Sequence, residues 1–128
     1  NNSLNFIEEL KFMAAGGKIA ADDPEAVTPQ EVFAAATLGG AAAQGREDCG
    51  AVKEGNRADL IVIDTTLPNM YPVHNIINNI VYSYSGSDIM MTVVDGKVVY
   101  ENGSYPTIDV EKTVYNVEKA VAKILERL

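Results

Sequence analysis

The chain has 128 residues, of which 47% are hydrophobic and 22% are charged, a balance typical of one globular domain and not of a disordered segment. Its formal charge of −8, with no cluster of Lys or Arg, argues against nucleic acid as a partner, because a phosphate backbone is bound by clustered positive charge. Apolar runs such as Leu60–Ile63 and Ile89–Val94 are far shorter than the roughly 20 residues that cross a bilayer, so we expect no membrane partner.

The single cysteine, Cys49, cannot form an internal disulfide, which favours a reducing, cytoplasmic location. The chain opens with Asn1-Asn2-Ser3, has neither an initiator methionine nor a signal-type sequence, and enters a helical pattern almost at once. We therefore expect it to be a piece of a longer protein.

The first helical pattern begins near the N-terminus, where Ser3 is a candidate N-cap. Gly16-Gly17 is expected to end this helix, and residues 18–27, which contain Asp22-Asp23-Pro24, are predicted to form a loop. The apolar residues that share one face of the helix are Leu4, Ile7, Leu10 and Ala14.

A capping box predicts the start of the second helix. Thr28 is the expected N-cap, Pro29 the first helical residue, and Glu31 lies three residues after the cap. The helix should reach Gly39-Gly40, and the alanines at 41–43 predict another short helical turn.

The character of the sequence changes to β-structure from residue 50. We expect extended residues at 50–52, a turn at 53–55, and a strand at Leu60–Ile63. Further along, Asp95-Gly96 lies between two β-prone runs. This dipeptide predicts a hairpin with a type I′ turn, because both central residues of that turn need positive φ.

Two further helices are predicted. Asn75 is the candidate N-cap of a short helix that ends near Gly86. In the C-terminal segment, apolar residues at alternating spacings of four and three predict an amphipathic helix. We favour docking of this helix onto a globular core over a coiled coil with a partner helix, since a coiled coil needs about three heptads or more. Its apolar residues are Val110, Val114, Val117, Val121, Ile124 and Leu128.

The residues offer few candidates for chemistry. His74 is the only histidine, so a histidine metal centre, a Ser-His-Asp triad or a Cys-His pair would have to be built around it. We favour a packing or capping role for His74, a half-buried packing role for Cys49, and acceptance of turn amides by Asp59. Adjacent acids are expected only to face solvent, namely Glu8-Glu9, Asp22-Asp23 and Glu47-Asp48.

The glycines do not form a nucleotide-binding motif. Gly39-Gly40 and Gly45 match neither the dinucleotide fingerprint nor the phosphate-binding loop, and Met90-Met91 is most simply packing. From the residues alone we therefore expect an α+β module with no self-contained catalytic, cofactor or metal site.

The run GAVKEGNRADLIVID, residues 50–64, resembles the C-terminal signature of the amidohydrolase superfamily. Segments 37–41, 75–86 and 93–99 also resemble family segments, in the same order, and so do the first residues of the chain. The resemblance therefore covers essentially the whole sequence. Residues 67–72 and 103–109 are most similar to the 5-methylthioadenosine and S-adenosylhomocysteine deaminases and the related chlorohydrolases.

The resemblance implies a (β/α)8 barrel with a small β-sandwich built from both chain ends, in which a divalent metal, zinc being favoured, activates water to release ammonia. Residues 1–48 would be the helical end of the barrel, 49–104 the C-terminal part of the sandwich, and 105–128 a C-terminal helix. The metal ligands and acid-base residue of the family correspond to no position here. We therefore assign no catalytic, cofactor-binding or metal residue, and at most Asn1 and Asn2 would lie near the substrate.

Three hypotheses follow. In the first, the chain is an inactive scaffold piece of an adenosine-type deaminase, with the remainder of the parent chain as its partner and a purine nucleoside as the parent's substrate. In the second, it is a stand-alone interaction module that forms a homo-oligomer through an exposed sheet edge and its C-terminal helix. In the third, the parent is a guanine or cytosine deaminase or a triazine chlorohydrolase.

Overall fold

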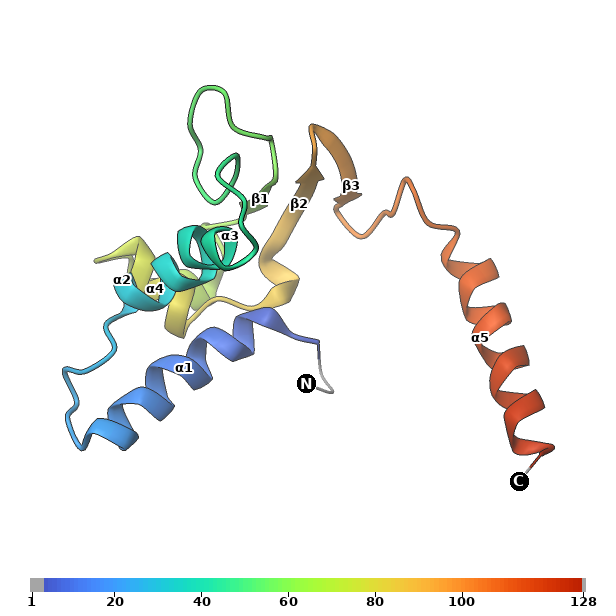
Figure 1. Cartoon of the computed structure of the whole chain (residues 1–128), viewed down its shortest axis with the longest axis horizontal. Coiled ribbons are helices and arrows are strands. Elements are labelled where there is room, and N and C mark those ends of the chain that lie inside the picture. Colours follow the sequence, from blue (N-terminus) through green and yellow to red (C-terminus); the bar gives the residue numbers. More distant parts are fainter. Residues whose placement is uncertain (1–3, 128) are drawn as a thin grey trace.

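The computed structural model describes residues 4–127. Helices α1, α2 and α4 pack into a helical body, a small sheet lies beside it, and α5 stands apart from both at the end of an extended connection (Figure 1). Fold class α+β is thus confirmed in this coarse form. The described elements, in chain order, are α1 (Phe6–Ala21), α2 (Pro29–Ala34), the π-helical turn η1 (Ala35–Gly39), α3 (Gly40–Ala43), β1 (Leu60–Ile63), η2 (Pro68–Met70), α4 (Ile76–Tyr82), η3 (Gly86–Asp88), β2 (Ile89–Val94), β3 (Lys97–Glu101) and α5 (Val110–Leu125).

Helix α1 is longer than the sequence suggests. It begins after Asn5, and the predicted cap Ser3 lies outside the described residues. The prediction that Gly16-Gly17 ends the helix is wrong, and so is the loop prediction for residues 18–21, because the helix continues to Ala21. The cause lies in packing, since a Cβ at Gly17 would collide with the side chain of Val27. Glycine at this position lets the following loop lie against the helix.

The predicted capping box at the start of α2 is confirmed. The backbone N–H of Thr28 donates to Glu31 Oε2 at 2.8 Å, and the N–H of Glu31 donates to Thr28 Oγ1 at 3.3 Å. The predicted helical turn at 41–43 is α3, and η1 joins it to α2 without a break. The three segments therefore form one rod that passes through Gly39-Gly40.

Helix α4 has the cap that the sequence predicts. The side-chain oxygen of Asn75 accepts from the backbone N–H groups of Ile77 and Asn78 at 3.0 and 3.2 Å, which satisfies donors that lack partners within the helix. The helix ends at Tyr82. It lies against both α1 and α2.

The described strands form an antiparallel sheet in the order β1-β2-β3. Asp95 and Gly96 have φ angles of 50° and 75°, which confirms the type I′ hairpin. The expectation of extended β-structure at residues 50–52 is wrong. Gly50 turns the chain with φ +85°, and a Cβ there would lie 3.0 Å from the carbonyl oxygen of Thr37, so this segment presses on the helical rod instead of joining the sheet.

The core lies between α1, α2 and α4 and includes a tyrosine from the turn after α4. Partly buried Ile63 and Ile89, at the ends of β1 and β2, pack against it from the sheet. Burial of these apolar side chains supplies the main stabilisation of the helical body. The buried residues are Ile7, Leu10, Ala14, Val32, Met70, Val81 and Tyr84.

Helix α5 forms as predicted but packs against no other element among residues 4–127. The side chain of Asp109 caps it by accepting from the N–H of Lys112 at 2.9 Å. None of its described residues is buried, so the expected docking onto a globular core is not found within residues 4–127, and Leu128 lies outside that range. None of the described helices combines the length and the apolar character needed to cross a membrane.

Candidate functional site

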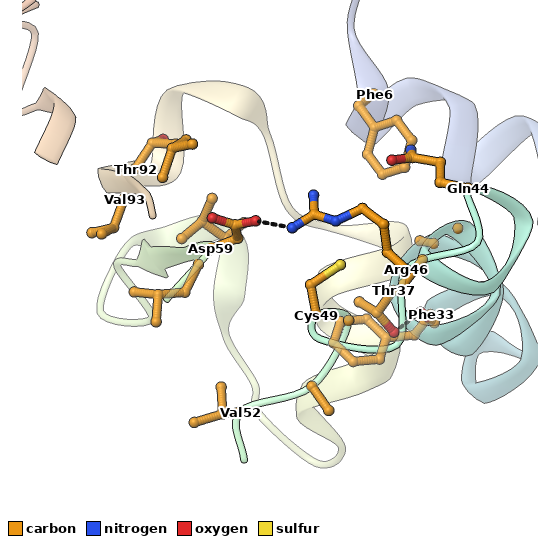
Figure 2. Close-up of a pocket in the computed structure, with 18 of the residues that line it drawn as sticks. Phe6, Phe33, Thr37, Gln44, Arg46, Cys49, Val52, Asp59, Thr92 and Val93 are labelled. Atoms are coloured by element: carbon orange, nitrogen blue, oxygen red, sulfur yellow. Dashed lines mark hydrogen bonds and ion pairs between the residues drawn. The ribbon is translucent and has the colours of Figure 1, made fainter. Parts of the chain in front are cut away.

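An open groove of about 760 Å³ lies between the helical rod and the sheet. Figure 2 shows side chains from the rod on one wall and from the sheet on the other. Carbon atoms make up most of the lining. The groove side chains that Figure 2 labels include Phe6, Phe33, Cys49, Val52, Thr92 and Val93.

One ion pair crosses this groove. Arg46, which follows α3, reaches Asp59, the residue before β1, with 3.1 Å between Nη2 and Oδ2 (Figure 2). Asp59 Oδ1 also accepts from the backbone N–H of Asp95 at 2.7 Å. The prediction that Asp59 satisfies a turn amide is therefore confirmed, and the turn is the distant hairpin. The Asp95 N–H, and after it the charge of Arg46, lower the pKa of the Asp59 carboxyl.

The ion pair continues into a chain of alternating charges. Asp48 lies 3.4 Å from Arg46 and 2.8 Å from Arg57, and Arg57 lies 3.6 Å from Asp95. Partial desolvation raises the pKa of Asp48, but the Arg57 hydrogen bond and the two positive charges outweigh it and leave that pKa lowered. The expectation that Asp48 only faces solvent is thus wrong. These five charges tie the hairpin turn to the end of the helical rod.

The structure confirms the expectation for Cys49 but not the one for His74. The side chain of His74 is exposed, and Asn75 caps α4 in its place, so the structure gives His74 neither the packing nor the capping role that we expected. Cys49 is half-buried, as predicted, and lines the groove beside Arg46. The described residues bring no general base to its thiol, which a cysteine nucleophile would need.

Sequence reasoning missed a buried polar cluster beside the core. Asp88 is 5% exposed and accepts from Asn69 Nδ2 at 2.7 Å and from the N–H of Ser85 at 2.9 Å. Nearby, Asn79 donates its side-chain amide to the carbonyl oxygen of Met70. The spacing of Ser85 and Asp88 is a second capping box and was the signal available. The cluster fixes the turn between α4 and β2.

The hydroxyl of Tyr84 is the exception in this cluster. Its side chain is fully buried, and its oxygen has no hydrogen-bond partner among the described residues. Burial, and to a smaller extent the charge of Asp88, raise the pKa of Tyr84 to about 12. A buried hydroxyl without a partner destabilises the fold, and nothing else in the cluster points to chemistry.

A metal does not fit these residues. Zinc in a catalytic site takes about three protein ligands plus a water. Within residues 4–127, no three His, Cys, Asp or Glu side chains gather in a way that could hold an ion. Asn1 and Asn2, which we expected near the substrate, lie outside the described residues. We therefore derive no catalytic step from this part of the chain.

Comparison with known proteins identifies a family and two similar deaminases. Residues 1–99 match the model of the Amidohydrolase family. The chain is 38% identical to the 5-methylthioadenosine/S-adenosylhomocysteine deaminase of Thermoanaerobacter pseudethanolicus, over 99% of this chain and 30% of that enzyme. It is 41% identical to the enzyme of the same name from Haloquadratum walsbyi, over 100% of this chain and 29% of that enzyme.

Two solved structures of zinc-bound hydrolases are similar to this chain. An adenosine deaminase from Xanthomonas campestris with bound zinc superposes with a TM-score of 0.89 at 25% identity, over 94% of this chain and 28% of that one. An atrazine chlorohydrolase from Arthrobacter aurescens in complex with zinc gives a TM-score of 0.78 at 26% identity, over 88% of this chain and 25% of that one. The chain thus spans about 30% of the length of the curated relatives that it matches.

Proposed function

The chain belongs to the amidohydrolase family, and from this membership we propose that it is the scaffold portion of a metal-dependent hydrolase that acts on C–N bonds outside peptides. The observation that carries the proposal is the 38% identity to a deaminase along 99% of this chain. The bound zinc of the Xanthomonas neighbour supports a divalent metal, zinc being favoured, in the parent protein.

For the substrate, we propose a purine nucleoside, as in 5-methylthioadenosine or S-adenosylhomocysteine. Relatives with that activity in their names reach 41% identity, whereas the chlorohydrolase neighbour reaches 26%. The similarity to the chlorohydrolase makes a triazine the second candidate substrate. Ammonia release from 5-methylthioadenosine by the intact parent, against chloride release from atrazine, separates the two. Turnover of atrazine alone would overturn the nucleoside assignment.

For the architecture, we propose that residues 1–48 are the helical end of a (β/α)8 barrel, 49–104 the C-terminal part of a β-sandwich, and 105–128 a C-terminal helix. Support comes from the sheet, whose described strands leave Ile61 at 46% and Val94 at 48% exposed. An apolar sheet face of this kind is expected to bury itself under another layer.

We further propose that the catalytic groups lie outside residues 4–127, so that the chain alone does not deaminate. The exposed His74 and the lack of a metal-binding cluster in that range support this. The test is to supply the purified chain with zinc and S-adenosylhomocysteine. We expect no ammonia, and metal-dependent ammonia release would refute the claim. The single cysteine supports a reducing compartment such as the cytoplasm.

The scaffold role is tested with a chimera in which this chain replaces the matching region of the Thermoanaerobacter deaminase. We expect the chimera to fold and to release ammonia in a zinc-dependent way. A folded but inactive chimera would contradict the scaffold role.

The second hypothesis, a self-associating module, keeps one supporting observation. Within the described range, β1 is an edge strand whose Val62 is 41% exposed, and such an edge can pair with another chain. Light scattering distinguishes the self-associating module from the scaffold portion. A monomer at every concentration is expected only for the scaffold portion.

A further inference from the structure

Helix α5 presents an apolar stripe that nothing in residues 4–127 covers. Figure 1 shows the helix separated from the sheet by the extended connection. Apolar stripes of helices normally pack against another element. The stripe consists of Val110, Val114, Val117, Val121 and Ile124, which are 47%, 51%, 57%, 48% and 58% exposed.

The similarity to a solved enzyme bears on the separated position of α5. The superposition on the Xanthomonas deaminase covers 94% of this chain, so the uncovered part is much shorter than residues 105–128. A TM-score of 0.89 leaves little room for a displaced segment of this length, from which we infer that most of it lies in the same place in both proteins. The space between α5 and the sheet is therefore part of the architecture, and this chain occupies only 28% of that enzyme's length.

The spacing of the stripe indicates what kind of element fills that space. Apolar residues at alternating intervals of four and three follow one side of a helix along its length, which suits a partner helix at a shallow crossing angle of about 20°. The 16 residues of α5 offer about 24 Å for that contact. Glu111 and Glu118 lie along one flank of the stripe, whereas Thr113 and Ala120 lie along the other. The partner helix should therefore carry Lys or Arg beside the acidic flank.

A second copy of α5 fits this surface poorly. An antiparallel pair would bring the two acidic flanks together, and a parallel pair would set Glu118 beside Thr113, so neither arrangement gives an ion pair across the stripe. The stripe is also entirely β-branched, without the alternating leucines of two-stranded coiled coils. In addition, 16 residues amount to little more than two heptads.

We propose that α5 packs lengthwise on a helix of the parent hydrolase that lies outside this chain. The inference rests on the proposed function. This chain would then contact the rest of the parent protein through two separate surfaces, one on the helical body and sheet and one on α5. None of the residues of α5 lines the groove between the helical rod and the sheet, so the proposed contact is separate from that groove.

Hydrogen exchange tests the docking directly. An isolated helix of this length is marginal in water, so the amides of α5 should exchange quickly in the free chain. In the chimera with the Thermoanaerobacter enzyme, we expect exchange at α5 to slow by about tenfold or more. Val114→Glu should abolish the slowing, whereas Asn116→Glu, which adds the same charge on the outward face, should preserve it.

The outcomes separate the two proposals. Fast exchange of α5 in an active chimera would overturn the docking and leave the scaffold role standing. Slow exchange in an inactive chimera would support the docking and contradict the scaffold role. A free chain that forms a dimer, and that Val114→Glu but not Asn116→Glu converts to a monomer, would show that a second copy is the occupant and overturn the proposal.

Discussion

The two adjacent glycines of α1 should respond in opposite directions to the same substitution. An added methyl group at Gly16 meets nothing within 4 Å, whereas at Gly17 it meets the side chain of Val27, whose Cβ would lie 2.9 Å away. Both residues are in the interior of the helix, so each Gly→Ala substitution gains about 1 kcal/mol of helix propensity. Only Gly17→Ala also carries a packing penalty.

The size of that penalty follows from how firmly Val27 is held. Lys18 Nζ donates to the carbonyl oxygens of Ala26 at 2.7 Å and Val27 at 3.4 Å, which fixes the loop against α1. Val27 is also β-branched and cannot swing away freely. Overpacking of this kind costs about 1–3 kcal/mol. We expect Gly16→Ala to stabilise the fold by about 1 kcal/mol and Gly17→Ala to destabilise it by up to about 2 kcal/mol.

Thermal unfolding followed by far-ultraviolet circular dichroism measures the difference. For a chain of this length, about 1 kcal/mol shifts Tm by about 3–5 °C, so the two variants should differ by several degrees, with Gly16→Ala the higher. Urea unfolding gives the same comparison as a free energy. A Gly17→Ala variant as stable as Gly16→Ala would refute the explanation of why α1 continues through these residues.

The remaining predictions concern the core and the ion pairs. Tyr84→Phe removes a buried hydroxyl that has no partner among the described residues, so urea unfolding should show no loss of stability; a loss above about 1 kcal/mol would reveal a partner. Because the folded pKa of Tyr84 is about 12, above its ordinary value of about 10, stability should fall between pH 10 and 12 in the wild type and less in the variant. The Asp95 N–H, and after it Arg46, lower the folded pKa of Asp59, so its contribution is present above about pH 4 and is lost on acidification. Asp59→Asn should therefore show a shallower acid loss, and equal profiles would contradict these contacts of the Asp59 carboxylate. Met70→Ala, at a fully buried side chain, should cost about 2–5 kcal/mol, whereas Met90→Ala, at a side chain 41% exposed, should cost less than about 1 kcal/mol; similar losses would place the core elsewhere.

Features that depend on neighbouring residues were predictable from the sequence. Thr28 and Glu31 satisfy each other within one helical turn, and Asp95-Gly96 meets the backbone requirement of its turn by itself. Asn75 caps α4 for the same local reason. In each case the interacting groups lie within three residues of one another, so spacing alone identifies the structure.

Features that depend on distant contacts were not predictable. The sequence around Gly17 predicts a helix end, because the contact with Val27 that favours glycine there is visible only in the fold. Asp59 accepts a hydrogen bond from an amide 36 residues away. The apolar stripe of α5 predicts packing on this chain, but none of the described residues of α5 is buried, and the chain spans only 30% of the first relative's length. The family could be recognised because residues 50–64 keep a local signature, whereas no pattern of neighbouring residues identified a catalytic group.

The most direct test of the scaffold assignment is ammonia release from 5-methylthioadenosine, measured side by side for the purified chain and for the chimera with the Thermoanaerobacter enzyme, each with and without zinc. The assignment predicts zinc-dependent release by the chimera and none by the chain. Zinc-dependent release by the chain alone, or none by a folded chimera, would contradict it.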